Sequence, residues 1–260
     1  MIGVVAVDEL TSAYKAVING EFRTGRHRSE KPVQGAVTWA RADAEQVVAV
    51  VGCHGGAGAS TVALGLAEAA GQGRVLECCT AAASGLASAS SAELGSAGDG
   101  WIRGSRGSVL IERQGDRLVS PAGCPPPSSG DLSFTIVDCG WDLDLLASAG
   151  GWLGDLVRSE SAVVVVARPT VPGLRRLEAA AGLLGQGHVI AVVVGLEKRW
   201  PRQVERALGP HGRALRAAGR LVCVPHDPGL AVNGLTPEPL PASIVAGCSA
   251  LLTLLEGRRR

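Results

Sequence analysis

The feature that most constrains this chain is a glycine-rich turn between an apolar run and a helix-like segment. The apolar run 47–51 is followed by the ten residues Gly52-Cys53-His54-Gly55-Gly56-Ala57-Gly58-Ala59-Ser60-Thr61. Glycines let the backbone bend so that successive N–H groups point at phosphate oxygens, and a following helix adds its positive dipole end. Ser60 would offer its hydroxyl to Mg²⁺. This order of elements predicts a phosphate-binding loop.

The loop lacks the lysine on which phosphate-loop chemistry depends. Ala59 stands directly before Ser60, where the amine of that lysine would reach the β- and γ-phosphates. Loss of a charged donor to phosphate removes roughly 1.5–3 kcal/mol of hydrogen bonding. The loop by itself therefore leaves open whether phosphate is still bound.

Strands and helices alternate from Gln46 onward. Continuous Val/Ile runs, rather than alternation, predict strands buried on both faces, which is typical of a parallel sheet covered by helices. The expected strands are 47–52, 74–79, 134–138, 162–167, 189–194 and 221–224, and the expected helices are 60–70, 173–184, 201–218 and 241–256. The predicted fold class is α/β, a P-loop NTPase (Rossmann-like) domain with a mainly parallel sheet flanked by helices and a short N-terminal extension.

The chain divides into three predicted parts. Residues 1–45 form an extension whose basic stretch 20–34 is a docking segment or, preferably, a solvated linker. The main domain covers 46–256, with an irregular insertion at 80–130 and a hairpin expected around Gln114-Gly115-Asp116. That insertion is either a functional lid or a mobile loop. Residues 257–260 are a basic tail after an apolar helix that we expect to pack in the core.

Composition limits the classes of partner. The 260 residues suit one α/β domain with appendages, and a formal net charge of +1 gives no bulk field toward nucleic acid or anionic membrane. We therefore expect contact with DNA to be indirect at most. Seven cysteines without a C-x-x-C pair, no basic n-region and no 18-residue apolar run indicate a cytoplasmic protein without a membrane span.

A family resemblance follows from these motifs. The stretch from His54 to Thr61 resembles the deviant Walker A loop of the ParA/MinD family, Lys-Gly-Gly-x-Gly-Lys-Thr-Thr, with both lysines replaced. Asp138 ends a strand as the Mg²⁺-associated aspartate of that family does. The segment 224–229 is similar to the Pro-x-Asp segment beside the nucleotide base. The resemblance covers about 46–256 and implies ATP or ADP with Mg²⁺ as cofactor, bound weakly or not at all.

The candidate site follows from the loop, the resemblance and one further cation. Arg168 follows the fourth expected strand, at the edge where ligands bind in such sheets. A solvent-facing arginine is the preferred reading of that residue, and a substitute for lysine the alternative. The candidate cofactor-binding residues are His54, Gly55, Gly56, Ala57, Gly58, Ala59, Ser60, Thr61, Arg168, Pro225 and Asp227, and the candidate metal ligands are Ser60 and Asp138.

Several positions depart from the family pattern. Cys79 and Ala81 stand where the second strand ends in an Asp-x-Asp pair, and Gly195 stands where a base-recognising asparagine is expected. Phosphoryl transfer depends on positioning and electrostatic stabilisation, so these losses argue against fast hydrolysis, and we assign no catalytic residue. Glu77, in an apolar strand, is expected to be salt-bridged or at the sheet edge.

Three functions remain open. The preferred one is a degenerate ParA/MinD-like pseudo-ATPase that acts through homodimerisation or an unknown protein partner. By resemblance, such proteins serve DNA or plasmid partitioning or transfer, or the positioning of cell machinery. The alternatives are a slow active ATPase that uses a cation such as Arg168, and a nucleotide-independent adaptor that docks through residues 1–45.

Overall fold

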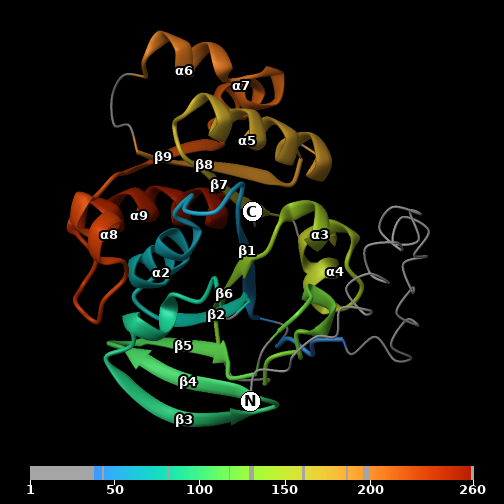
Figure 1. Ribbon diagram of the computed structural model, residues 1–260, viewed down its shortest axis with the longest axis vertical. Coiled ribbons are helices and arrows are strands. Elements are labelled where there is room, and N and C mark those ends of the chain that lie inside the picture. The colour runs from blue at the N-terminus through green and yellow to red at the C-terminus, as the bar shows by residue number, and fades with distance from the viewer. Residues whose placement is uncertain are drawn as a thin grey trace, which may run out of the picture. The chain divides into compact units, whose positions relative to one another are not determined.

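The described residues form one nine-stranded sheet with helices on both faces (Figure 1). The computed structural model describes residues 38–42, 44–80, 82–116, 118–128, 132–159, 162–185, 187–195 and 200–258. Residues 1–37 of the expected N-terminal extension therefore lie outside the described residues.

Seven neighbouring strands of the sheet run parallel. The strand order is β3-β4-β5-β2-β6-β1-β7-β8-β9, with β4 antiparallel to both of its neighbours. The strands are β1 (Gln46–Gly52), β2 (Gly73–Cys79), β3 (Ala92–Gly98), β4 (Trp101–Arg106), β5 (Val109–Gln114), β6 (Phe134–Gly140), β7 (Val163–Ala167), β8 (Val189–Gly195) and β9 (Leu221–Pro225). The predicted α/β class with a mainly parallel sheet is confirmed.

The helices agree with the expected ones in three cases and divide in a fourth. They are α2 (Ala59–Ala69), α3 (Leu143–Ser148), α4 (Trp152–Ser159), α5 (Val171–Leu184), α6 (Arg202–Ala207), α7 (Pro210–Ala217), α8 (Pro228–Asn233) and α9 (Ala242–Gly257), with 3₁₀ turns η1 (Leu86–Ala89) and η2 (Pro121–Gly123). The expected helix 201–218 is interrupted because Pro210 begins α7 and disfavours helical geometry in the residue before it.

The described residues of the insertion between β2 and β6 add three strands to the sheet. They contribute η1, the antiparallel strands β3 and β4, and β5. The chain reverses at Asp99-Gly100 and again at Gly107, all with positive φ. The hairpin expected around Gln114-Gly115-Asp116 is misplaced, because Gln114 ends β5 and the Asp-Gly turn signal lies earlier, at Asp99-Gly100.

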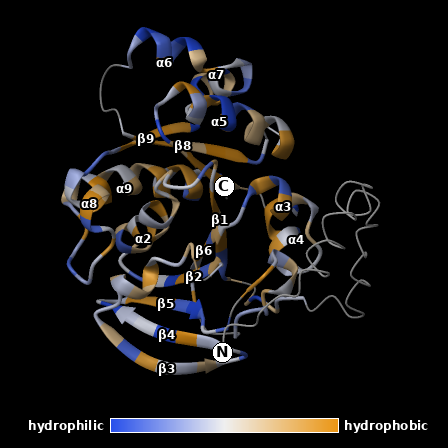
Figure 2. Ribbon diagram, viewed as in Figure 1, coloured by the Kyte–Doolittle hydropathy of each residue, from blue (hydrophilic) through white to orange (hydrophobic). Residues whose placement is uncertain are grey.

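Two hydrophobic layers enclose the sheet. One contains Val47, Ala49 and Val51 of β1 and is covered by α3–α7, and the other contains Val48 and Val50 and is covered by α2 and α9. The central strands are correspondingly the most continuously hydrophobic ribbons in Figure 2. Helix α9 packs into the second layer, as expected. Within the described residues, no helix combines the length and apolarity needed to cross a bilayer.

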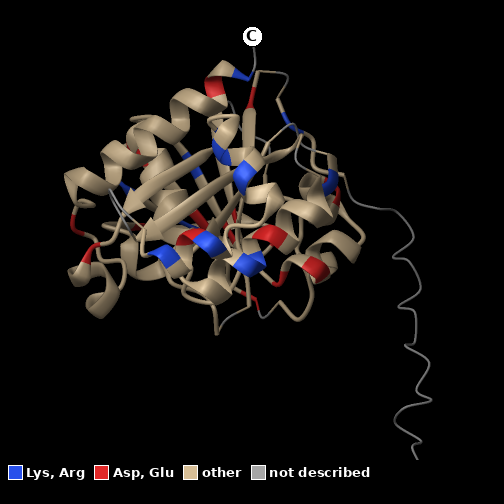
Figure 3. Cartoon of the chain, turned by 90° about the horizontal axis from the view of Figure 1, so that it is seen from above, with Lys and Arg blue, Asp and Glu red and all other residues tan. Residues whose placement is uncertain are grey.

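Charged positions lie mainly on helices and loops (Figure 3), but one arginine is fully buried in the sheet. Arg74 of β2 is paired with Glu45 at 3.1 Å and with Glu112 of β5 at 3.2 Å. Its guanidinium also lies 5.8 Å from the ring centroid of Trp39. Trp39 and Glu45 are buried, so the folded unit begins ahead of the boundary expected at residue 46.

Arg74→Met should destabilise the protein strongly. Removal of one partner leaves the Glu45 carboxylate buried without a counter-charge, which costs about 3–5 kcal/mol of unfolding free energy. Urea denaturation followed by circular dichroism measures this loss. Arg216→Met is the control, because Arg216 and Glu205 form a partly exposed pair at 3.4 Å and should contribute at most about 1 kcal/mol. Similar losses in the two variants would contradict a structural role for the buried pair.

Candidate functional site

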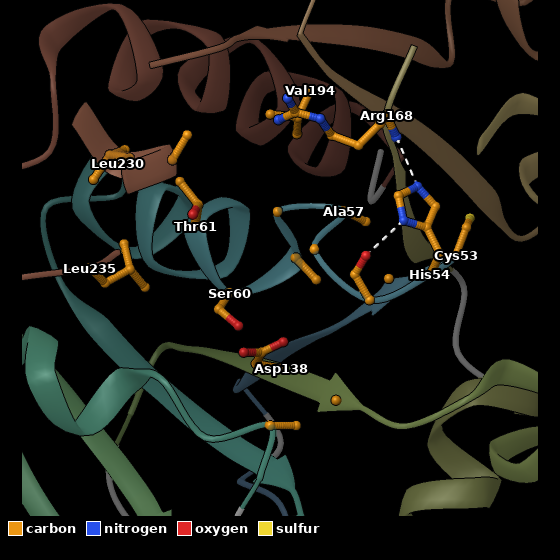
Figure 4. A pocket seen from close by; sticks show the side chains of 18 of the residues that line it. Cys53, His54, Ala57, Ser60, Thr61, Asp138, Arg168, Val194, Leu230 and Leu235 are labelled. Atoms are coloured by element: carbon orange, nitrogen blue, oxygen red, sulfur yellow. Dashed lines mark hydrogen bonds between the residues drawn. The ribbon is translucent and has the colours of Figure 1, made fainter. Parts of the chain in front are cut away.

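A cavity of about 750 Å³ lies at the carboxyl ends of the parallel strands (Figure 4). Every residue proposed from the sequence as a cofactor or metal contact lines it. These residues are His54, Gly55, Gly56, Ala57, Gly58, Ala59, Ser60, Thr61, Asp138, Arg168, Pro225 and Asp227. Parallel strands place their carboxyl ends at one edge, and this explains why segments far apart in the sequence meet there.

The glycine loop between β1 and α2 needs its glycines for two reasons. Gly56 and Gly58 have φ angles of 71° and 97°, in the left-handed region that side chains disfavour. A Cβ atom on Gly58 would also lie 3.3 Å from Cγ2 of Val194, on the neighbouring part of the cavity wall. The loop is thereby packed closely against β8.

The N-terminus of α2 faces the cavity without a cap. Gly58 occupies the N-cap position, no side chain accepts a hydrogen bond there, and the first turn holds no acidic residue. The first N–H groups of a helix have no intrahelical acceptor, and the helix dipole adds partial positive charge to them. This end of the helix is therefore suited to an anion.

Asp138 of β6 is the buried carboxylate at the base of the loop. Its side chain is 3% exposed, and its Oδ1 atom has no hydrogen-bond partner among the described residues. Burial raises the pKa of Asp138 to about 7; the Ser60 hydroxyl, which faces the carboxylate in Figure 4, lowers it, and the charge of Glu77 raises it further. A carboxylate left unpaired in this way is suited to bind a cation.

His54 is hydrogen-bonded within its own loop and to the next strand connection. Its Nδ1 atom lies 2.9 Å from the carbonyl oxygen of Gly55, and its Nε2 atom accepts from the backbone N–H of Arg168 at 3.3 Å (Figure 4). This pair of contacts fits a neutral imidazole protonated on Nδ1. The ring thus connects the glycine loop to the segment that carries Arg168.

Two arginines supply positive charge to the cavity. Arg168 follows β7 and extends toward Val194 above the loop (Figure 4), and Arg176 reaches the cavity from α5. Among the described residues, neither guanidinium has a hydrogen-bond or ion-pair partner. Arg176 was not identified as a site residue from the sequence. Arg175 beside it is also an arginine, and only the rotation of α5 about its axis decides which of the two lines the cavity.

The other carboxylates near the cavity are already engaged. Asp142 accepts from the N–H of Asp144 at the start of α3, and Asp227 accepts from the N–H of Leu230 at the start of α8. Asp227 therefore forms a helix cap. Burial raises the pKa of the Cys79 thiol, which leaves no carboxylate or thiolate at the end of β2.

Glu77 differs from both of its expected environments. It lies on β2, between β5 and β6, and not at the sheet edge. Its carboxylate accepts hydrogen bonds from Ser84 Oγ at 2.8 Å and from the N–H groups of Gly85 and Leu86 at 2.7 and 2.8 Å, without an ion pair among the described residues. Glu77 thus orders the chain before η1, since these donors replace the water lost on burial.

The far side of the cavity is apolar. Leu230 of α8, Leu235 of the following loop and Ile244 of α9 line it beside Pro225. Gly195 ends β8 and does not line the cavity, and Ala81 lies outside the described residues. No cluster of three or more His, Cys, Asp or Glu suited to a metal occurs in the described ranges, so any cation here depends on few protein ligands.

Asp138→Asn should make the protein more stable at neutral pH and equally stable near pH 4. The folded pKa of about 7 exceeds the ordinary 3.8, so stability is fully present below pH 3.8 and is lost as the pH rises to 7. The total loss is about 4 kcal/mol of unfolding free energy, and asparagine avoids it because it does not ionise. Urea denaturation at pH 4, 5.5 and 7.5 without Mg²⁺ measures the difference; Asp155→Asn, at an exposed position, is the control. A difference that does not change with pH would contradict the assignment.

Comparison with known proteins shows a likeness in fold. No protein-family model matches the sequence, and no curated protein matches it. A Borrelia burgdorferi structure assigned to plasmid partition, bound to AMPPNP, has a TM-score of 0.51 at 9% identity and covers 83% of this chain and 100% of its own. The apo McdA of Cyanothece has a TM-score of 0.50 at 8% identity, covering 82% of this chain and 100% of its own. The MinD cell division ATPase of Pyrococcus furiosus has a TM-score of 0.49 at 15% identity, covering 82% and 98%. The chain therefore shares the fold of the plasmid partition and McdA structures.

Proposed function

We propose that this chain is a degenerate, ParA/MinD-like protein that binds a nucleotide with Mg²⁺ and does not hydrolyse it rapidly. It acts in the cytoplasm through dimerisation or a protein partner, in the partitioning of DNA or the positioning of cell machinery. The partition and McdA structures that share its fold support the process at that coarse level. The Borrelia protein was solved with a nucleotide analogue, which supports the ligand class.

One observation carries the ligand assignment. The unpartnered Oδ1 atom of Asp138 lies at the base of a glycine loop whose helix N-terminus is uncapped. The cavity wall thus holds a buried carboxylate beside a site for anions. This combination is suited to a ligand that consists of a cation and phosphates. Mg²⁺ is typically held by one or two carboxylates together with substrate phosphates, so Asp138 and the Ser60 hydroxyl fit it. Bound there, Mg²⁺ would offset the negative charge of the phosphates.

Two arginines take the place of the missing lysines in this proposal. The guanidinium groups of Arg168 and Arg176 line the same cavity and have no other partner among the described residues. Arginine presents planar donors that match phosphate oxygens, and each charged hydrogen bond contributes roughly 1.5–3 kcal/mol. His54, through its contact with the Arg168 backbone, would help to hold the first of these cations in place.

Among the described residues, no carboxylate that lines the cavity is left to position water for rapid hydrolysis. Of the carboxylates that line the cavity, Asp142 and Asp227 cap helices, and Asp138 is assigned to the metal. The thiol of Cys79 is not a base, because burial raises its pKa. Bound nucleotide would then act by fixing the conformation of the residues around the cavity opening. A second copy of the chain or another protein would bind to that surface.

A slow ATPase is the second candidate, and the two arginines that line the cavity without a partner among the described residues favour it. A cation directed at developing charge on the transferred phosphoryl group can contribute on the order of 10²–10³ in rate. This alternative requires that turnover be lost in Arg168→Ala or Arg176→Ala. The adaptor hypothesis rests on residues 1–45, of which all but 38–42, 44 and 45 lie outside the described residues.

Isothermal titration calorimetry with Mg-ATP and Mg-ADP tests the proposal. We expect measurable binding, about tenfold weaker in Arg176→Ala and about tenfold tighter in Ala59→Lys, because one charged contact to phosphate is removed or restored. Arg175→Ala is the matched control, since Arg175 is adjacent on α5 and does not line the cavity.

Each result discriminates among the candidates. No heat at millimolar nucleotide would exclude both nucleotide-dependent functions and favour the adaptor. Equal losses in Arg175→Ala and Arg176→Ala would mean that the cavity-facing arginine does not contact the ligand. Phosphate release well above the uncatalysed rate, abolished in Arg168→Ala, would replace the pseudo-ATPase with the slow enzyme.

A further inference from the structure

The apolar wall of the cavity depends on a loop with little support of its own. The segment 234–240 connects α8 to α9 and contributes Leu235 to the wall, opposite the glycine loop in Figure 4. No backbone–backbone hydrogen bond within the described residues involves 235–240, and Pro237 and Pro239 have no N–H group to donate. Some other contact must therefore fix the shape of this loop.

Side chains from the insertion between β2 and β6 bind the carbonyl groups of that loop. Arg106, at the end of β4, donates from Nη1 to the carbonyl of Thr236 and from Nη2 to the carbonyl of Glu238. The Oγ atom of Ser88 in η1 lies 2.9 Å from the carbonyl oxygen of Leu235 and 2.8 Å from that of Gly85, so its single proton is shared between the two acceptors. These three bonds join segments separated by 130, 132 and 147 positions in the sequence.

The same guanidinium is anchored on its other side. Arg106 donates from Nε to the carboxylate of Glu68 on α2 and from Nη1 to the carbonyl of Ala89 at 3.1 Å. The residue is only 6% exposed. A planar guanidinium with five donors can bind four acceptors in this arrangement, whereas the single ammonium of lysine cannot span them.

We propose that Arg106 is a positioning residue that holds the 234–240 loop, and with it Leu235, at the apolar end of the cavity, where the base of a nucleotide would lie. Ser88 assists it. The insertion thereby determines how well the cavity accepts the base of a nucleotide, while the glycine loop and the two arginines bind the phosphates. This inference rests on the proposed function, since it assigns the two ends of the same ligand to different parts of the chain.

The test compares a ligand that has a base with one that lacks it. Calorimetry measures the binding of Mg-ATP and of Mg-tripolyphosphate to the full-length protein, Arg106→Lys and Ser88→Ala. We expect Mg-ATP to bind about tenfold more weakly in Arg106→Lys and about threefold more weakly in Ser88→Ala, because the apolar wall loses the hydrogen bonds that hold it. The affinity for tripolyphosphate should not change, because the phosphate-binding groups are intact. Ser88 is exposed, so its variant keeps the test valid if Arg106→Lys folds poorly.

Arg103→Lys is the matched control. Arg103 lies on the same strand and pairs with Glu112, away from the loop. It should leave the affinity for both ligands unchanged. Equal weakening of both ligands in Arg106→Lys, or unchanged affinity for Mg-ATP in both Arg106→Lys and Ser88→Ala, would overturn the positioning role. Equal affinity of the unmodified protein for the two ligands would overturn it as well.

A measurement without ligand separates this inference from the proposed function. Methyl order parameters of Leu235 from NMR should fall in Arg106→Lys and stay unchanged in Arg103→Lys, because only the first variant releases the loop. Failure of the unmodified protein to bind any nucleotide would overturn the proposed function and leave this result standing. An unchanged Leu235 order parameter in Arg106→Lys would overturn the inference whatever the binding data show.

Discussion

The central parallel strands are covered on both faces by hydrophobic layers, and this burial determines where any chemistry can occur. Alternate residues of β1 enter opposite layers, so neither face of the strand is open to a ligand. Polar groups can meet a ligand only where strands end and connections begin. The glycine loop, Asp138, Arg168 and Pro225 all lie at that edge because the strands that carry them run in the same direction.

Asp138 lowers the stability of the folded state at neutral pH. A carboxylate that is 3% exposed and lacks a partner for Oδ1 destabilises the folded state at neutral pH. Most buried polar groups are satisfied. Glu77, on the neighbouring strand β2, accepts hydrogen bonds from Ser84, Gly85 and Leu86, which follow that strand. The contrast between these two carboxylates, on adjacent strands, is the physical reason to assign Asp138 to a cation and Glu77 to structure.

The sequence predicted six of the seven parallel strands closely, because continuous Val and Ile runs are typical of strands buried on both faces. It missed the seventh, β5, whose residues Val109–Gln114 fall in the insertion that was expected to be irregular. It did not predict β3, whose residues Ala92–Gly98 are almost all exposed, small or polar and carry no alternating pattern. It placed the glycine loop and Asp138 because local motifs carry them. Arg176 could not be chosen over Arg175, since the choice depends on the rotation of a helix against the sheet.

The role of Arg106 is the feature that the sequence could least predict, because its contacts with Thr236 and Glu238 span half of the chain or slightly more. In the proposed function, the absence of the Walker lysines affects only the phosphate end of the cavity, and the bonds of Arg106 support the apolar wall at the other end. Buried charge is costly unless it is fully satisfied, and here the satisfied acceptors include the loop that shapes the cavity. Under the proposed function, the phosphate end and the base end would be supported by separate parts of the fold, so one could diverge while the other is maintained.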